Sequence, residues 1–307
     1  MKRLGTIQVD MDSFRVILKS YNYKEAPSIT RRTIYQIAIP RFLELFNKYN
    51  IKATFFVIGE DLLKKENQEI VRWISGEGHE IANHTMTHTI NPSFSGIAMR
   101  EKEKEINQAG ELIRKTTGFT PVGFKAPAFS IDSQTIAILE KKGYLYDSSL
   151  FPSSLPFVLR CMQRIMLRQK TGKTQWGRAI YALAPLKPYR MRLDKIWRQG
   201  KDTKIKEAPV TTMPFFGLPF HASFVYTAGI NLFKIGYRLV KSRNLPLNYQ
   251  LHALELVGPD EMDKRILNKR PGAKMPLNKK FDIYNYILKN ISRDYRIVTT
   301  KELIRLS

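Results

Sequence analysis

The sequence predicts an α/β fold built on a parallel sheet or barrel, and three observations support this. Short apolar or β-branched segments alternate with segments of helical periodicity, which is typical of parallel strands joined by helices. Glycines and helix-capping residues separate many of these segments. Acidic and histidine side chains directly follow several predicted strands, which is where such folds carry their functional residues.

The N-terminal half shows this alternation most clearly. Residues 53–58 form an aromatic and β-branched run that stops at Gly59, which indicates a buried strand. A helix is expected over residues 132–142, because Asp132 can cap its start and Gly143 can end it. The other strands expected here are 4–10, 81–83, 123–125 and 144–147, and the other helices are 33–49, 66–76 and 100–117.

The C-terminal half continues the pattern after an uncharged stretch. Residues 208–233 contain no Asp, Glu, Lys or Arg and are long enough to cross a bilayer. Pro209, Pro214 and Pro219 argue against a membrane-spanning helix, so we expect a buried strand at 209–213, a loop and a short surface helix. Further on, the expected helices are 232–243 and 279–290, and the expected strands are 247–252 and 296–299.

The positive charge is concentrated in one segment. The chain has a formal net charge of +24, and residues 155–206 hold 14 Lys and Arg but only two acidic residues. Arg160, Arg164 and Arg168 would share one face of a helix, with apolar residues mostly on the other side. Such a basic amphipathic insert suits an anionic membrane surface. The alternative is a solvated helix whose apolar side packs on its own domain.

Cysteine use and the N-terminus limit the class of protein. A single cysteine, Cys161, excludes a disulfide framework and any zinc site built from cysteines. The N-terminus has no apolar core of the kind found in signal peptides. We therefore expect a cytoplasmic protein of one domain, residues 1–307, without a transmembrane helix.

The residues able to do chemistry follow the predicted strands. Asp10 and Asp12 close the first strand, and His84 and His88 follow the third. Two histidines four residues apart can share a metal if the segment turns once, although a pair of polar loop histidines is the simpler alternative. Two imidazoles and one carboxylate would leave coordination positions open for water and substrate, as in catalytic zinc sites. The other candidates at strand ends are Lys125, Pro127, Asp147 and His252.

These motifs, in this order, resemble those of the NodB-homology polysaccharide deacetylases, carbohydrate esterase family 4. Val9-Asp10-Met11-Asp12 looks like the first motif of the family in its Asp-x-Asp form, and residues 78–88 (GHEIANHTMTH) match the second. The resemblance covers residues 4–150 well and 205–300 loosely, and it implies a distorted (β/α) barrel. It is closest to branches such as the undecaprenyl-phosphate aminoarabinose deformylases.

The resemblance also implies roles for individual residues. Asp12, His84 and His88 would hold a divalent metal, with zinc expected first and cobalt, nickel or manganese as alternatives. Asp10 would be the general base, His252 would protonate the leaving amine, and Asp147 would orient or tune these groups. Lys125 stands where the family usually has an arginine. Phe151 would stand in for the aromatic residue of the fourth motif, and the expected substrate-binding residues are Pro127, Phe129 and His221.

The resemblance therefore implies a metal-dependent hydrolase that removes an acetyl or formyl group from an amino sugar. A cytoplasmic enzyme with a basic insert at 155–206 suits a polyprenyl-phosphate-linked sugar at the inner membrane face, with the protein bound peripherally there. The alternatives are a deacetylase of soluble or polymeric glycans, an inactive glycan-binding relative, and a nucleic-acid-binding protein. The last is not expected, because the chain shows no recognised nucleic-acid-binding module.

Overall fold

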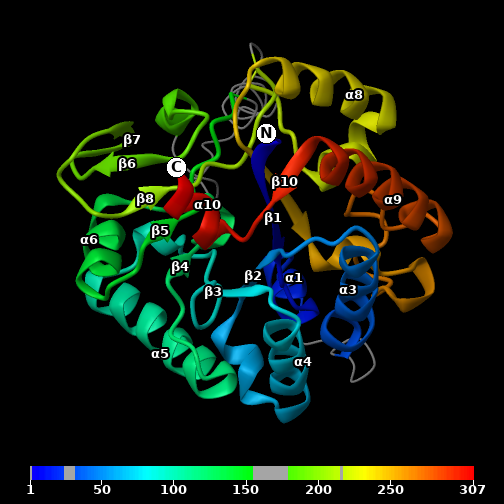
Figure 1. The fold of residues 1–307 in the computed structure, drawn as a ribbon. Coiled ribbons are helices and arrows are strands. Elements are labelled where there is room, and N and C mark those ends of the chain that lie inside the picture. The colour runs from blue at the N-terminus through cyan, green and yellow to red at the C-terminus, as the bar shows by residue number, and fades with distance from the viewer. Residues whose placement is uncertain (1, 24–31, 155–178, 215–216) are drawn as a thin grey trace, which may run out of the picture.

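The computed structural model describes residues 2–23, 32–154, 179–214 and 217–307 of the chain. Its parallel sheet curls into a distorted barrel with helices on the outside (Figure 1), which confirms the predicted fold class. The first strand, β1 (Arg3–Asp10), lies at the centre of this arrangement.

Strand β1 pairs in parallel with three other strands. One of its edges pairs along six residues with β9 (Leu247–His252). Its other edge pairs with β10 (Tyr295–Ile297) near its start and with β2 (Thr54–Val57) near its carboxyl end. The parallel order then continues through β3 (Glu80–Asn83), β4 (Gly123–Phe124), β5 (Tyr146–Asp147) and β8 (Lys206–Glu207).

An extended segment after β8 joins the two ends of this sheet. The backbone N–H of Ala208 donates to the carbonyl of Asp147 at 2.8 Å, and that of Thr211 donates to the carbonyl of Asn248 at 3.0 Å. The strand predicted at 209–213 is therefore wrong as a regular strand, although its residues do lie between β5 and β9. Pro209 and Pro214 have no N–H to donate, so a continuous ladder cannot form here.

The helices pack around the outside of the strands (Figure 1). Asp132 caps α6 as predicted, because its carboxylate accepts from the backbone N–H of Thr135 at 2.9 Å. Gly118, at a φ of +80°, ends α5. The helices are α1 (Phe14–Ser20), α3 (Ile39–Lys48, preceded by the π-helical turn η1, Thr33–Ala38), α4 (Lys65–Gly76), α5 (Met99–Thr117), α6 (Ser133–Lys141), α8 (Ala222–Ser242), α9 (Leu277–Asp294) and α10 (Thr300–Leu306).

The core has an outer and an inner part. Ile7, Val9 and Phe55 belong to the large cluster that the strands share with the surrounding helices. A smaller cluster joins Phe56, Ala82, Tyr146 and Ala208 to Ile304 of the last helix, α10. The inner face of β1 is polar, since the Gln8 side chain donates to Ser148 at 2.9 Å and to Thr300 at 3.2 Å. Alternation along β1 thus places Asp10 on the same inner face as Gln8.

The basic segment extends the sheet where the structure describes it. Residues 189–199 form an antiparallel hairpin, β6 (Tyr189–Arg192) and β7 (Lys195–Gln199), and β6 pairs with β8. The sequence analysis did not predict this hairpin. The amphipathic helix expected around Arg160, Arg164 and Arg168 lies outside the described residues.

Helix α8 takes in both the short helix expected at the end of the uncharged stretch and the helix expected at 232–243. It runs from Ala222 to Ser242, and Gly229 interrupts it with a φ of +80°. A glycine fits there because the left-handed region costs it little. Among the described residues, none of the helices has both the length and the apolar character needed to cross a membrane.

His79, which precedes β3, is a core histidine. Its Nδ1 accepts from the backbone N–H of Ala53 at 2.9 Å, and its ring packs against those of Phe46 and Phe55. Burial, followed by the nearby charge of Lys52, lowers its pKa to about 4.

We expect this histidine to make the protein less stable in mild acid. Between pH 6.5 and 4 the unfolded chain binds a proton at residue 79 that the folded chain does not, so the free energy of unfolding falls as the pH drops, by up to about 3 kcal/mol. Urea denaturation of the wild type and of His79→Gln across this range tests it. The variant should show a shallower pH dependence, and parallel curves would contradict the assignment.

Candidate active site and metal centre

A cavity of about 380 Å³ lies at the carboxyl ends of β1, β3, β4 and β9, where a parallel α/β fold is expected to carry its site. Its volume falls in the range of about 300–1,000 Å³ that is typical of small-molecule sites. The side chains that line it are those of Asp10, Asp12, Val16, Ile17, Ser20, Tyr21, His84, His88, Ile90, Lys125, Ala126, Ala128, Phe129, Gln250, His252, Lys269, Arg270 and Pro271.

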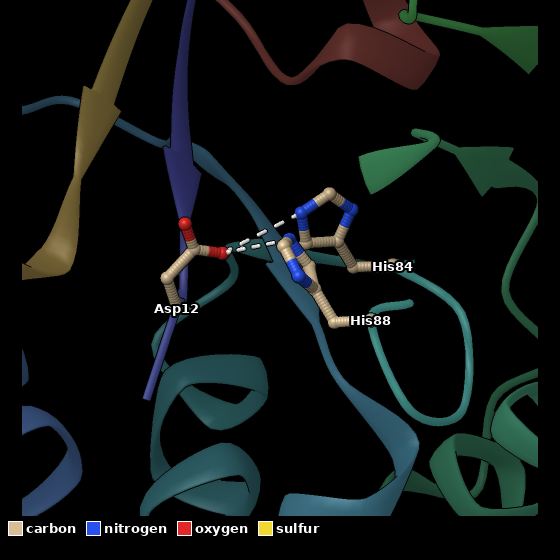
Figure 2. A group of neighbouring side chains, drawn as sticks. All are labelled: Asp12, His84 and His88. Atoms are coloured by element: carbon tan, nitrogen blue, oxygen red, sulfur yellow. Dashed lines mark ion pairs between the residues drawn. The ribbon is translucent and has the colours of Figure 1, made fainter. Parts of the chain in front are cut away.

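Three of these side chains converge on one point (Figure 2). Asp12 follows β1, and His84 and His88 belong to the loop after β3. One carboxylate oxygen of Asp12 lies 3.6 Å from Nε2 of His84 and 3.3 Å from Nε2 of His88. One potential ligand atom from each residue lies within 4.8 Å of the others.

Local hydrogen bonds hold the two histidines in this arrangement. Nδ1 of His84 lies 2.7 Å from the carbonyl oxygen of Lys125, so this nitrogen is a donor and the ring is held with Nε2 toward Asp12. The side chain of Asn83 accepts from the backbone of Thr85, whose hydroxyl accepts from the backbone of His88. Thr85 and His88 both adopt positive φ values, 65° and 53°, which these bonds stabilise.

The three side chains fit a divalent metal ion. Within the described parts of the chain, the buried Oδ1 of Asp12, which both histidines face, has no hydrogen-bond partner. Burial opposes ionisation of Asp12, but His88 and His84 outweigh it and hold the pKa of that carboxyl well below its usual range. Two imidazole nitrogens and one ionised carboxylate oxygen are the ligands of many catalytic zinc sites, which leave positions open to water.

Asp10 lies beside this cluster in a charged network of its own. Nζ of Lys125 is 2.8 Å from Oδ1 of Asp10, and the Lys125 side chain is only 1% exposed. The amide of Gln250 donates to Oδ2 at 2.6 Å. Burial raises the pKa of Asp10, but the charges of Lys125, His84 and His252 outweigh it, so the pKa lies below its usual value. Asp10 is therefore a carboxylate at neutral pH.

His252 lies beside Asp10 on the neighbouring strand β9 and has a second carboxylate behind it. Its Nε2 lies 3.9 Å from Oδ2 of Asp10, and its Nδ1 lies 3.7 Å from Oε1 of Glu255. Ser223 contacts both Nδ1 of His252, at 3.3 Å, and the Glu255 carboxylate, which also accepts from Tyr284. Burial lowers the pKa of His252, but Glu255 and Asp10 outweigh this and raise the pKa above its usual value.

Other predicted site residues lie around the cavity or behind it. Phe129 lines the cavity, and its ring stacks on that of Phe151 with the two ring centroids 5.1 Å apart. The ring of Phe151 in turn meets His221 edge-on at 5.8 Å. His221 and Pro127 are not among the residues that line the cavity. Burial, followed by the charge of His252, lowers the pKa of His221 to about 4, so it is neutral at pH 7.

Asp147 lies behind the cavity, fully buried at the end of β5. Its carboxylate accepts from the Ser149 hydroxyl at 2.5 Å, and it interacts with the equally buried Glu207. Burial raises the pKa of both carboxyls, that of Asp147 to about 6 and that of Glu207 well above its usual range. Asp147 and Glu207 are thus two interacting buried carboxyl groups. That Asp147 orients or tunes the catalytic residues stays a prediction.

The sequence analysis missed several polar residues of the site. Gln250 lies two residues before His252 on β9, so strand periodicity could have placed both on one face. Glu255 lies three residues after His252, which is also a detectable spacing. Lys269 and Arg270 lie in an irregular segment, and no local pattern in the sequence assigns them to the cavity.

Comparison with known proteins agrees with this geometry. Residues 26–146 match the family model described as polysaccharide deacetylase, and this range includes His84, His88 and Lys125. The chain is related to the polysaccharide deacetylases. Over 157 residues it is 34% identical to a peptidoglycan deacetylase of Helicobacter pylori, an alignment that covers 50% of this chain and 51% of the relative.

Other polysaccharide deacetylases match over shorter stretches. A peptidoglycan-N-acetylglucosamine deacetylase of Bacillus cereus is 34% identical over 88 residues, which cover 29% of this chain and 30% of that protein. This chain therefore spans about half, or less, of the length of these curated relatives. A crystal structure of a protein from Mycobacterium smegmatis, named as a polysaccharide deacetylase, superposes on this chain with a TM-score of 0.65 at 17% identity. The superposition covers 99% of this chain and 89% of the Mycobacterium chain, which supports a shared fold.

Proposed function

We propose that this chain is a metal-dependent amide hydrolase that removes an acetyl or formyl group from an amino sugar. The observation that carries the proposal is the cluster of Asp12, His84 and His88 beside the ionised Asp10 in one cavity. A divalent cation held by this cluster would supply Lewis acidity toward an amide carbonyl oxygen and a water molecule. Zinc suits the ligands, and cobalt, nickel and manganese are the alternatives.

Asp10 is the proposed general base. Its carboxylate can take a proton from the water molecule that attacks the amide carbon. Lys125 and Gln250 each hold one of its oxygens, which fixes the orientation of the carboxylate toward the cavity. The C–N bond then breaks, and the products are a free carboxylic acid and an amine.

His252 is the proposed general acid, because the departing nitrogen must gain a proton. Its raised pKa keeps a larger fraction of the imidazole protonated near neutral pH. Glu255 and Ser223 contact its Nδ1 from behind, which leaves Nε2 directed toward Asp10. The base and the acid therefore lie on the same side of the cavity, within reach of one amide group.

The substrate is proposed to be an N-acylated sugar linked to a polyprenyl phosphate, with the protein bound peripherally at the inner membrane face. The density of Lys and Arg in residues 155–206 supports this proposal, because such residues each contribute about 1 kcal/mol toward an anionic surface. The names of the relatives favour a second candidate, a polymeric or soluble glycan. Flotation with anionic vesicles separates the two, and a protein that never floats would argue against the lipid-linked substrate.

The test of the function combines metal content with acid release. The purified protein should contain about one divalent metal ion per chain and release acetate or formate from an N-acylated amino sugar. Chelation should abolish release, and added zinc should restore it. A metal-loaded, folded protein that releases neither acid from peptidoglycan, chitooligosaccharide or lipid-linked amino sugars would contradict the proposal.

A further inference from the structure

A basic segment forms part of the wall of the same cavity. Lys269, Arg270 and Pro271 line it together with Asp10 and Asp12, and Tyr21 lies on the same wall. Arg270 also borders a smaller pocket beside His252. The side chains of Lys269 and Arg270 therefore lie within reach of a molecule bound at the candidate active site.

Neither of these two cations is neutralised by a carboxylate among the described residues. Nζ of Lys269 donates to the hydroxyl of Tyr23 at 2.7 Å and lies over the rings of Tyr21 and Tyr23. Nε of Arg270 is buried and has no hydrogen-bond partner in the described chain. Arg265, in the same segment, instead pairs with Asp263 at 2.7 Å. A buried guanidinium N–H without a partner is costly, and an anionic ligand would supply one.

The segment is held in place before any ligand binds. Backbone N–H groups of Lys269 and Arg270 donate to the carbonyl of Ile266, whose side chain is fully buried. Gly272 has a φ of +74°, and a Cβ there would come within 2.5 Å of the Tyr226 ring. Only glycine fits this close approach. The backbone that carries the two cations is thus held in place, so binding an anion has to order only their side chains.

We propose that Lys269 and Arg270 form an anion-binding subsite that takes a phosphate group carried by the sugar whose N-acyl group lies at Asp10 and Asp12. The inference rests on the proposed function and narrows its substrate class. The guanidinium of Arg270 can bind phosphate oxygens through parallel N–H donors, and Lys269 adds a second positive charge. Asp10, in the same cavity, already has its own cation, since it is paired with Lys125. Asp10 therefore does not neutralise Lys269 or Arg270, and both stay available to an anion.

The test compares two substrates that differ in this phosphate. N-acetylglucosamine 1-phosphate and the neutral methyl N-acetylglucosaminide are offered to the metal-loaded wild type and to the double variant Lys269→Gln/Arg270→Gln. We expect the wild type to prefer the phosphorylated sugar, and the double variant to lose about tenfold or more of that preference, mainly through KM. Lys274→Gln is the matched control, because Lys274 is an exposed cation of the same segment that does not line the cavity.

Binding without turnover gives an independent measurement. In isothermal titration calorimetry on proteins that also carry Asp10→Asn to suppress turnover, N-acetylglucosamine 1-phosphate should bind the Lys269→Gln/Arg270→Gln form at least tenfold more weakly than the form with both cations, with equal metal content in both proteins. Unchanged binding would overturn the subsite even if the protein deacetylates neutral sugars. If the wild type released acetate from none of the substrates and the double variant still bound the sugar phosphate more weakly, the result would contradict the proposed function but support the subsite.

The source of the phosphate is then decided with vesicles. If the phosphate belongs to a lipid carrier, vesicles of phosphatidic acid in phosphatidylcholine should compete with N-acetylglucosamine 1-phosphate in the wild type and not in the double variant. If only the soluble sugar phosphate binds through Lys269 and Arg270, the substrate carries its phosphate without a lipid. Both results support the subsite, and competition that is equal in the two proteins overturns it.

Discussion

Asp10→Asn is expected to lower kcat for acid release by about two to four orders of magnitude while the protein keeps its metal ion. An amide cannot accept the proton of the attacking water, and general base catalysis typically contributes about 10²–10⁴-fold. Asp12, His84 and His88 remain in place, so metal content should stay near one ion per chain. Steady-state kinetics and elemental analysis on the same preparation measure both quantities.

The control for this variant concerns the charge left behind. Removal of the Asp10 carboxylate strands the buried ammonium of Lys125, which lies 2.8 Å away, and breaking such a pair typically costs about 3–5 kcal/mol. The double variant Asp10→Asn/Lys125→Met removes both charges and should recover much of the stability in urea denaturation without recovering activity. Activity that returns together with stability would show that Asp10 acts through the fold and would contradict its role as the base.

Asp12→Ala is expected to abolish both metal binding and activity. Asp12 supplies the only carboxylate of the three-residue cluster, and the two histidines that remain make a weak site. Metal content after dialysis should fall to near zero, and kcat/KM should drop by about 10³-fold or more, since the Lewis acid is lost. Elemental analysis and acid release assays check the two effects.

A histidine outside the cluster provides the matched comparison. His79→Gln alters a buried histidine in the core, so this variant should keep its metal ion even though it is less stable. His88→Ala should behave like Asp12→Ala. If Asp12→Ala retained a full complement of metal, the ligands would lie elsewhere and the candidate centre would be wrong.

Much of the fold could be predicted because local pattern and tertiary environment agree. The buried run at β2, the cap of α6 at Asp132 and the glycine that ends α5 are each determined by a few neighbouring residues. The convergence of Asp12, His84 and His88 follows from parallel strands, whose carboxyl ends meet at one edge. Strand order and side-chain direction then leave little freedom for these three groups.

The remaining features depend on contacts that a local pattern does not encode. The β6–β7 hairpin, for which the sequence analysis made no prediction, places Tyr189 and Ile196 in a cluster with distant residues such as Phe94 and Phe124. Arg270 reaches the cavity from an irregular segment, where neither helical nor strand periodicity predicts a direction. For Asp147, position at a strand end suggested a place in the site, but this residue is fully buried beside Glu207 and is not among the residues that line the cavity.

Residue 125 contributes to the site in two chemically separate ways. Its carbonyl oxygen fixes the proton of His84, a task that the main chain of any amino acid can perform. Its ammonium neutralises Asp10, a task that only a cationic side chain can perform. An exchange between lysine and arginine can therefore adjust the basicity of Asp10 without disturbing the metal ligands. This position would let an engineer shift the pH range of catalysis while metal affinity is left unchanged.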